Sequence, residues 1–199
     1  MTEEKWDEVI DVNLKCYAAT IRFAAPHFIA QGSGVIVNTG STSGLGHLGV
    51  ANYAAAKEGV LGLTRTVARD LGQYGVRCNM IRPVSLMSDL FSPELLEGIE
   101  LSAKLGLPTN GIRHHITREG VRPSGEHVAA LVVLLCLPQA AHISGQDFYI
   151  KGDEAGRFPE PELIRSVYHS GGWTLKDFLN PDILDNFLGD NCNRYVKEK

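Results

Sequence analysis

The sequence has no excess of positive charge, no paired cysteine motif and no long apolar run, and each absence argues against a class of function. Its 19 lysines and arginines are outnumbered by 23 acidic residues, so no basic face is available to nucleic acid. The four cysteines are scattered, without metal-site spacing, and free thiols in a reducing cytoplasm are expected. No apolar stretch reaches the roughly 18 residues of a membrane span. We expect a cytoplasmic protein without nucleic-acid or membrane partners.

Helical and strand-like patterns alternate along most of the chain. Apolar residues recur every three or four positions from Trp6 onward, and Thr2 is suited to cap that helix. We expect it to weaken near Pro26 and to end by "QGSG" at 31–34. The further elements expected are a strand at 35–39, a helix at about 52–73, a strand at 76–81 ended by Pro83, a helix from Ser124 to about 137 and a strand at 143–152. Such strand–helix–strand units favour an α/β fold with a parallel sheet.

One α/β domain at 1–156 is expected, with an appended helical tail at 157–199 in which "FPEPEL" would begin a helix. The weakly patterned stretch 84–123 is typical of a lid or binding loop. Its apolar residues could line a substrate pocket or simply pack the lid; they are Phe91, Leu95, Leu96 and Leu101. The polar residues around the last strand are expected to be solvated; they are Asp147, Lys151 and Asp153.

The segment "NYAAAK" at 52–57 places a phenol and an ammonium one helical turn apart. Residues four apart share a helix face, with Cβ atoms about 5–6 Å apart, so Lys57 is expected beside Tyr53. A nearby ammonium favours the phenolate, which suits Tyr53 to general acid–base chemistry. Because this spacing also arises by chance in amphipathic helices, the pair alone does not define a site.

Two other polar positions add context to this pair. Ser41 directly follows the strand at 35–39, where strand ends in α/β sheets open onto a ligand crevice. Its hydroxyl could hold a substrate carbonyl oxygen, although Thr42 or Ser43 could serve instead, or all three could be turn residues. Asn13 interrupts the apolar face of the first helix and could equally be an ordinary hydrogen-bonded core amide.

In order and spacing, these segments resemble the short-chain dehydrogenase/reductase family, classical type, over about residues 4–153. "VIDVNLK" is similar to its asparagine-bearing helix, "VIVNTGSTSG" to its serine strand and loop, and "NYAAAK" to its Tyr-x-x-x-Lys helix. "VRCNMIRPVSLMSD" resembles its proline segment, and "ISGQDFYIKGD" its last strand. The resemblance implies the C-terminal portion of a Rossmann-like, three-layer parallel sheet, with about three strands and flanking helices.

The resemblance also implies an NAD- or NADP-dependent oxidoreductase that interconverts a small alcohol and a ketone by hydride transfer. Tyr53 would be the general acid/base, and Lys57 would support it and hold the nicotinamide ribose. Ser41 would orient the carbonyl, and Asn13 would hold a water that links Lys57 to solvent. The nicotinamide amide would be held by Pro83, Val84, Leu86 and Ser88. Val84 stands where the family usually has glycine, and its larger side chain narrows the space for the nicotinamide.

The family begins with a half that carries a glycine-rich phosphate loop and the residue that selects NAD or NADP, but only 12 residues precede Asn13. We therefore expect the phosphate-binding loop to be absent from this chain. "GLGHLG" at 44–49 does match G-x-G-x-x-G, and Arg82 would be a candidate clamp for a 2′-phosphate. The helix is expected to begin only at Asn52, which leaves these glycines in a loop rather than at a helix N-terminus, so we reject the match.

Two hypotheses of different class remain. Retention of Asn13, Ser41, Tyr53 and Lys57 favours an enzyme, whereas the missing loop favours a truncated, catalytically inactive remnant that acts as an interaction subunit. The resemblance implies a homo-oligomer formed through the helices that bear Asn13 and Tyr53. No metal site is expected.

The histidines are weaker candidates. The pair at 114–115 with Glu119 is expected in a polar loop, and His127 on a helix surface. His47 lies between Ser41 and Tyr53 and could contact substrate.

Overall fold

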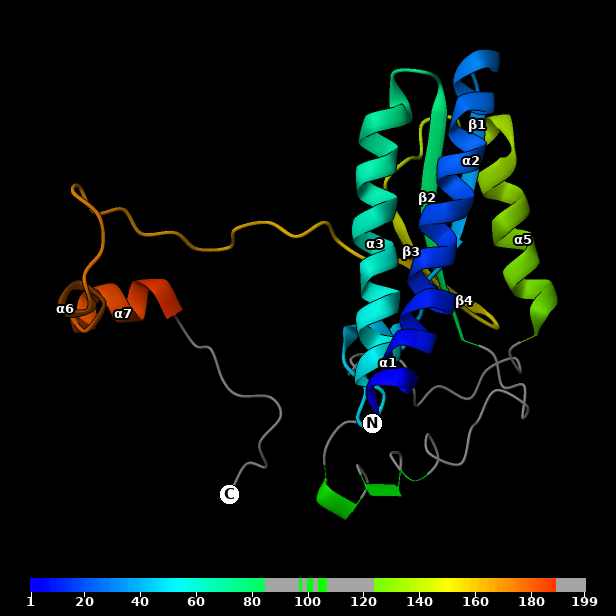
Figure 1. Cartoon of the computed structure of the whole chain (residues 1–199). Coiled ribbons are helices and arrows are strands. Elements are labelled where there is room, and N and C mark those ends of the chain that lie inside the picture. Colours follow the sequence, from blue (N-terminus) through cyan, green and yellow to red (C-terminus); the bar gives the residue numbers. More distant parts are fainter. Residues whose placement is uncertain (85–96, 98–99, 102–103, 107–123, 189–199) are drawn as a thin grey trace. The chain divides into compact units, whose positions relative to one another are not determined.

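The computed structural model describes residues 1–84, 97, 100–101, 104–106 and 124–188 (Figure 1). The chain divides into two compact units, residues 1–159 and 160–199. Several residues named above lie outside the described residues: Leu86, Ser88, Phe91, Leu95, Leu96, the histidines at 114–115, and Glu119.

The first unit contains a four-stranded sheet in the order β1-β2-β3-β4. The strands are β1 (Gly34–Thr39), β2 (Val76–Pro83), β3 (Asp147–Lys151) and β4 (Glu154–Arg157). β1, β2 and β3 are parallel, which confirms the predicted α/β class. The antiparallel β4 was not predicted, because its sequence "EAGR" has no β-branched or aromatic residue to indicate a strand.

The N-terminal helix is continuous but changes its hydrogen bonding. It consists of α1 (Glu3–Ile10), a π-helical segment η1 (Asp11–Lys15) and α2 (Cys16–Gln31). The expected weakening at Pro26 was wrong: α2 passes through Pro26 and ends at Gly32, whose φ of 69° is left-handed. Pro26 is exposed, so water can reach the carbonyl group that loses its helical partner. The irregularity lies instead at η1.

Helices cover both faces of the sheet (Figure 1). α2 and α3 (Ala51–Gly72) lie side by side over one face, and α5 (Gly125–Cys136) packs on β1 and β3 from the other. Two core clusters join α2 and α3 to alternate residues of β2: Ile21, Val67 and Cys78 in one, and Val60, Leu61 and Met80 in the other. Two short 3-10 helical turns complete the described elements of this unit: η2 (Thr42–Leu45) follows β1, and η4 (Pro138–Ala140) follows α5.

The second unit contains α6 (Leu175–Phe178) and α7 (Pro181–Leu188). Residues 158–174 contain no helix, so the expectation that "FPEPEL" begins one was wrong. Residues that precede proline are biased away from the helical region, which explains the extended segment. Among the described residues, no helix is both long and apolar enough to cross a membrane.

Candidate functional site

The carboxyl ends of β1 and β2 gather most of the predicted site residues that the structure describes. Ser41 follows β1, Pro83 ends β2, and α3 carries Tyr53 and Lys57 in its first two turns. Because β1 and β2 are parallel, their carboxyl ends meet at one edge of the sheet, the edge at which α/β proteins bind ligands.

Lys57 is the best-defined member of this site. Its side chain is only 6% exposed, and its Nζ donates to the Thr39 carbonyl (3.1 Å) and to the Tyr17 hydroxyl (3.4 Å). Burial lowers the pKa of the Lys57 amine. In the described part of the chain no carboxylate forms an ion pair with it. Lys57 is therefore a buried cation held by neutral oxygens.

Tyr53 lies beside this ammonium, with its ring centroid 5.6 Å from Lys57 Nζ. Its backbone N–H donates to Asn52 Oδ1 at 2.8 Å, and the buried Asn52 also donates to the Lys5 carbonyl of α1. Within the described residues, no hydrogen bond joins the Tyr53 hydroxyl to Ser41 or Lys57. The predicted adjacency of Tyr53 and Lys57 on one helix face is confirmed.

Tyr17 is a member of the site that the sequence analysis missed. It projects from α2, and its hydroxyl donates to the Thr39 carbonyl at 3.1 Å. Lys57 Nζ lies 5.1 Å from its ring centroid, so the ammonium faces two tyrosine rings. The available signal was spacing: Tyr17 lies four residues after Asn13, one helical turn away.

Ser41 caps the 3-10 turn η2 rather than standing free. Its Oγ accepts a hydrogen bond from the Ser43 N–H at 3.1 Å, and its carbonyl accepts one from Arg82 Nη1 at 2.6 Å. Thr42 begins η2, and the Ser43 hydroxyl is 3.3 Å from His47 Nδ1. The Ser41 position is thus fixed at both its side chain and its backbone.

A buried ionic cluster around Arg82 holds this turn in place. Arg82 is fully buried; its Nε donates to both oxygens of Asp147 (2.8 and 3.0 Å), and Nη2 donates to Glu58 at 2.9 Å. The expectation that Asp147 is solvated was wrong, because its side chain is 2% exposed. Burial raises the pKa of the Asp147 carboxyl, and the Arg82 guanidinium opposes that shift.

The same cluster accounts for the first glycine of "GLGHLG". A Cβ on Gly44 would lie 2.7 Å from Glu58 Oε2 and 2.9 Å from Arg82 Nη1, so a side chain there would displace the ion pair. The helix that follows begins at Ala51, after all three glycines. Arg82 has every nitrogen engaged by Asp147, Glu58 and Ser41. These observations agree with the rejection of a phosphate loop.

Asn13 lies in the π-helical segment η1, which packs closely on α3. A Cβ on Gly59 of α3 would come within 2.9 Å of the Leu14 side chain, so any larger residue there would require Leu14 to move. No hydrogen bond within the described residues joins Asn13 to Lys57. Its role as a water holder therefore stays a prediction.

Three more predicted positions are partly defined. The Val84 N–H donates to the Ile150 carbonyl at 2.9 Å, so this donor is already used by the sheet. His47 is half-buried, and its Nε2 is inaccessible to solvent and has no hydrogen-bond partner among the described residues. Burial lowers the pKa of His47. His127 was expected on a helix surface, but it is half-buried and completes a capping box with Ser124.

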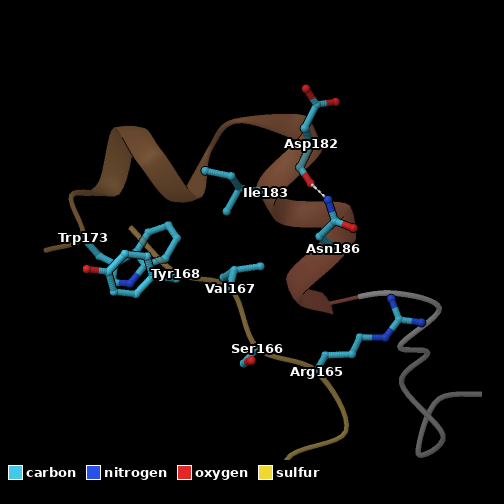
Figure 2. Close-up of a pocket in the computed structure, with 8 residues that line it drawn as sticks. All are labelled: Arg165, Ser166, Val167, Tyr168, Trp173, Asp182, Ile183 and Asn186. Atoms are coloured by element: carbon cyan, nitrogen blue, oxygen red, sulfur yellow. Dashed lines mark hydrogen bonds between the residues drawn. The ribbon is translucent and has the colours of Figure 1, made fainter. Parts of the chain in front are cut away.

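A separate cavity of about 470 Å³ lies in the second unit (Figure 2). Its walls come from the extended segment and from α7, and include Arg165, Tyr168, Trp173 and Asn186. None of the predicted site residues lines it. Trp173 also stacks on Phe178, with ring centroids 4.8 Å apart, so the cavity adjoins this unit's own small aromatic core.

A mainly parallel sheet covered by helices on both faces, with hydroxyls, phenols and an ammonium at its carboxyl edge, defines an α/β protein of the Rossmann-like class. Comparisons with known proteins make the assignment more specific. A short chain dehydrogenase family model matches residues 1–95. The 3-oxoacyl-[acyl-carrier-protein] reductase FabG of Staphylococcus aureus (strain Mu50) is 36% identical over 156 residues, covering 76% of this chain and 58% of that protein.

Two further matches cover nearly all of the chain. The hydroxyacyl-CoA dehydrogenase ChsB1 of Mycobacterium tuberculosis is 33% identical and covers 95% of this chain and 58% of its own length. A crystal structure of a short chain dehydrogenase from Mycobacterium avium matches with a TM-score of 0.69 and 27% identity, covering 100% of this chain and 62% of that one. The chain belongs to the short-chain dehydrogenase/reductase family. It spans 58% of the length of both curated relatives.

Proposed function

We propose that this chain carries the reaction centre of an NAD- or NADP-dependent oxidoreductase that interconverts an alcohol and a ketone in the cytoplasm. The observation that carries the proposal is the buried Lys57 ammonium, 5.6 Å from the Tyr53 ring centroid at the carboxyl edge of the sheet. A desolvated ammonium there acts on charge that develops on a substrate oxygen beside it with little screening by water.

Tyr53 acts as the general acid/base in this proposal. In the oxidation direction its phenolate takes the hydroxyl proton of the substrate; in the reduction direction its phenol returns that proton to the carbonyl oxygen. Ser41, fixed by Ser43 and Arg82, holds the same substrate oxygen. Asn13 holds a water near Lys57. A nicotinamide, when bound, supplies or receives the hydride.

The residues present fit the nicotinamide end of such a cofactor. Lys57 is buried, its hydrogen-bond partners among the described residues are neutral, and hydroxyl oxygens of a ribose are suitable additional acceptors. The nicotinamide amide would lie near Pro83, Val84, Leu86 and Ser88. The Val84 N–H is already engaged, so other groups must serve there. Arg82 is engaged as well and does not select NADP over NAD.

An acyl thioester is the substrate class that we favour. The names of two relatives, a 3-oxoacyl-[acyl-carrier-protein] reductase and a hydroxyacyl-CoA dehydrogenase, both describe an acyl chain that bears an oxygen function. The second relative covers 95% of this chain, and the missing 5% of 199 residues is about 10, so at least three quarters of the second unit is included. This shared tail favours a hydroxyacyl-CoA over a carrier-protein substrate.

Turnover of acetoacetyl-CoA, followed through nicotinamide absorbance with NADH and with NADPH, tests the proposal. Replacing Tyr53 with phenylalanine removes the acid/base and is expected to lower kcat by about 10²–10⁴-fold. Tyr74→Phe is the matched control, since Tyr74 lies in the turn beyond the C-terminal end of α3, and it should leave kcat unchanged. Full activity of Tyr53→Phe would refute the assigned role.

A non-catalytic role as an interaction subunit is the second candidate. Exposed apolar side chains favour it, above all Phe23 on α2, which is 74% exposed. No turnover with either cofactor, together with a stable complex with another protein, would select this candidate.

A further inference from the structure

The surroundings of Lys57 contain a second phenol, that of Tyr17. Within the residues that the structure describes, the Lys57 ammonium has two oxygen partners, and one of them is the Tyr17 hydroxyl at 3.4 Å. The hydroxyl is itself held, because it donates to the Thr39 carbonyl at 3.1 Å, the same oxygen that accepts from Lys57. Lysine, tyrosine and the end of β1 therefore form a closed triangle of hydrogen bonds.

The Tyr17 ring is as well placed as its hydroxyl. It packs against the cluster of Val60, Leu61 and Met80, and Lys57 Nζ lies 5.1 Å from its centroid. An aromatic face that meets a partly desolvated cation adds electrostatic attraction to the hydrogen bond. Packing thus fixes the ring, and the ring fixes the hydroxyl.

We propose that Tyr17 is a positioning residue for the catalytic lysine, whose hydroxyl holds the Lys57 ammonium between two tyrosine rings. This inference rests on the proposed function for its catalytic meaning. The sequence led us to expect a water held by Asn13 near the ammonium; the Tyr17 hydroxyl, four residues further along, is a protein partner of the ammonium that this expectation did not include. Tyr17 keeps Lys57 charged and directed at Tyr53 in a site that burial otherwise makes unfavourable for a cation.

Lys57 faces few other titratable groups. Tyr17 and Cys16 approach it from α2, and Tyr53 stands on its own helix, while β1 presents the Thr39 carbonyl. Burial is the largest influence and lowers the pKa of the amine, whereas Cys16 acts in the opposite direction. Removing the Tyr17 hydroxyl takes away a partner of the charged form, so it should lower that pKa further.

The rate at which acetic anhydride acetylates Lys57 across a pH series, read by peptide mass spectrometry, tests the inference in the whole chain without requiring turnover. The acetylation rate at high pH, where it reaches a plateau, reports how accessible the amine is. The pH at which the rate reaches half of that plateau, the midpoint, reports the charge of the amine. Tyr17→Phe keeps the packed ring, and its midpoint should fall by about one pH unit, the scale of a hydrogen bond to a charged group. Tyr74→Phe should leave the midpoint unchanged.

A second variant, Tyr17→Met, lacks both hydroxyl and ring and should show at least the same shift, which keeps the test decisive if one variant folds poorly. A midpoint that stays at the wild-type value in a folded variant overturns the inference. If the midpoint shifts but wild-type protein turns over no substrate, the placement of Tyr17 stands and the proposed function fails. If wild-type protein turns over substrate normally and the midpoint of the Tyr17 variants does not move, the proposed function stands and the placement of Tyr17 fails.

Discussion

At the scale of single residues, the turn after β1 contains a buried imidazole nitrogen that finds no partner in the described part of the chain. This nitrogen is Nε2 of His47, whose Nδ1 is 3.3 Å from the Ser43 hydroxyl. Burial lowers the pKa of His47 in the folded protein, so the neutral ring is the one that the fold accommodates. The unfolded chain has no such constraint and takes up a proton near the ordinary value of 6.5. This difference couples stability to pH.

The direction of that coupling follows from the lowered pKa. The contribution of His47 to stability is present above its unfolded pKa and is lost as pH falls through the folded one. As pH falls from about 7.5 to 5.5, the free energy of unfolding of wild type should therefore fall more steeply than that of His47→Gln. The two slopes should differ by up to about 1.4 kcal/mol per pH unit. Urea unfolding at each pH measures this, with the exposed His142→Gln as control. Parallel slopes in wild type and His47→Gln would contradict the assignment.

At the scale of elements, the Arg82 cluster ties together strands, helix and turn. Arg82 of β2 bonds Asp147 of β3, Glu58 of α3 and the Ser41 carbonyl, and its guanidinium lies 5.3 Å from the centroid of the Phe158 ring. Its two acidic partners differ: Asp147 is 2% exposed, whereas Glu58 is 43% exposed. The Arg82–Asp147 pair is the part of the cluster on which stability should depend.

A double-mutant cycle on that pair tests this view. Arg82→Met leaves the Asp147 carboxylate buried without its partner, and a loss of about 3–5 kcal/mol in the free energy of unfolding is expected. Removing both charges in Arg82→Met/Asp147→Leu should restore a large part of that loss, because neither buried charge is then unpaired. Urea denaturation of wild type, Arg82→Met, Asp147→Leu and the double variant gives the coupling free energy between the two residues. Additive losses would show that the two residues act independently.

The sequence allowed the elements and the local pairs to be predicted, because both depend on short spacings. β1, α3 and β2 follow from apolar patterning, and Tyr53 and Lys57 share a helix face through a four-residue interval. The Arg82–Asp147 pair joins positions 65 apart, and Tyr17 meets Lys57 across 40. No local pattern reports which charged residue of a strand end will be buried. The π-helical η1 also has no propensity signal in "DVNLK".

At the scale of the whole molecule, both units leave large apolar side chains in solvent. In the second unit, Leu163, Ile164 and Tyr168 are each about 90% exposed. In the first, α1, η1 and α2 expose Trp6, Val12, Phe23 and Ile29 to different degrees, from 39% to 74%. Patches of this kind favour association with another chain. The helical surface near Asn13 is where we predict a homo-oligomer to form.

Phe23 is the side chain on which that association should depend most. Aromatic residues dominate interface energetics, and a buried glutamate in its place would carry an unpaired charge. Phe23→Glu is therefore expected to weaken self-association by at least about thirtyfold, a loss of about 2 kcal/mol. Sedimentation equilibrium over a concentration series measures the dissociation constant, with Tyr74→Glu, an exposed aromatic after α3, as the control. A wild-type protein that is monomeric throughout the series, or a Phe23→Glu protein that assembles as wild type does, would show that these helices do not form the interface.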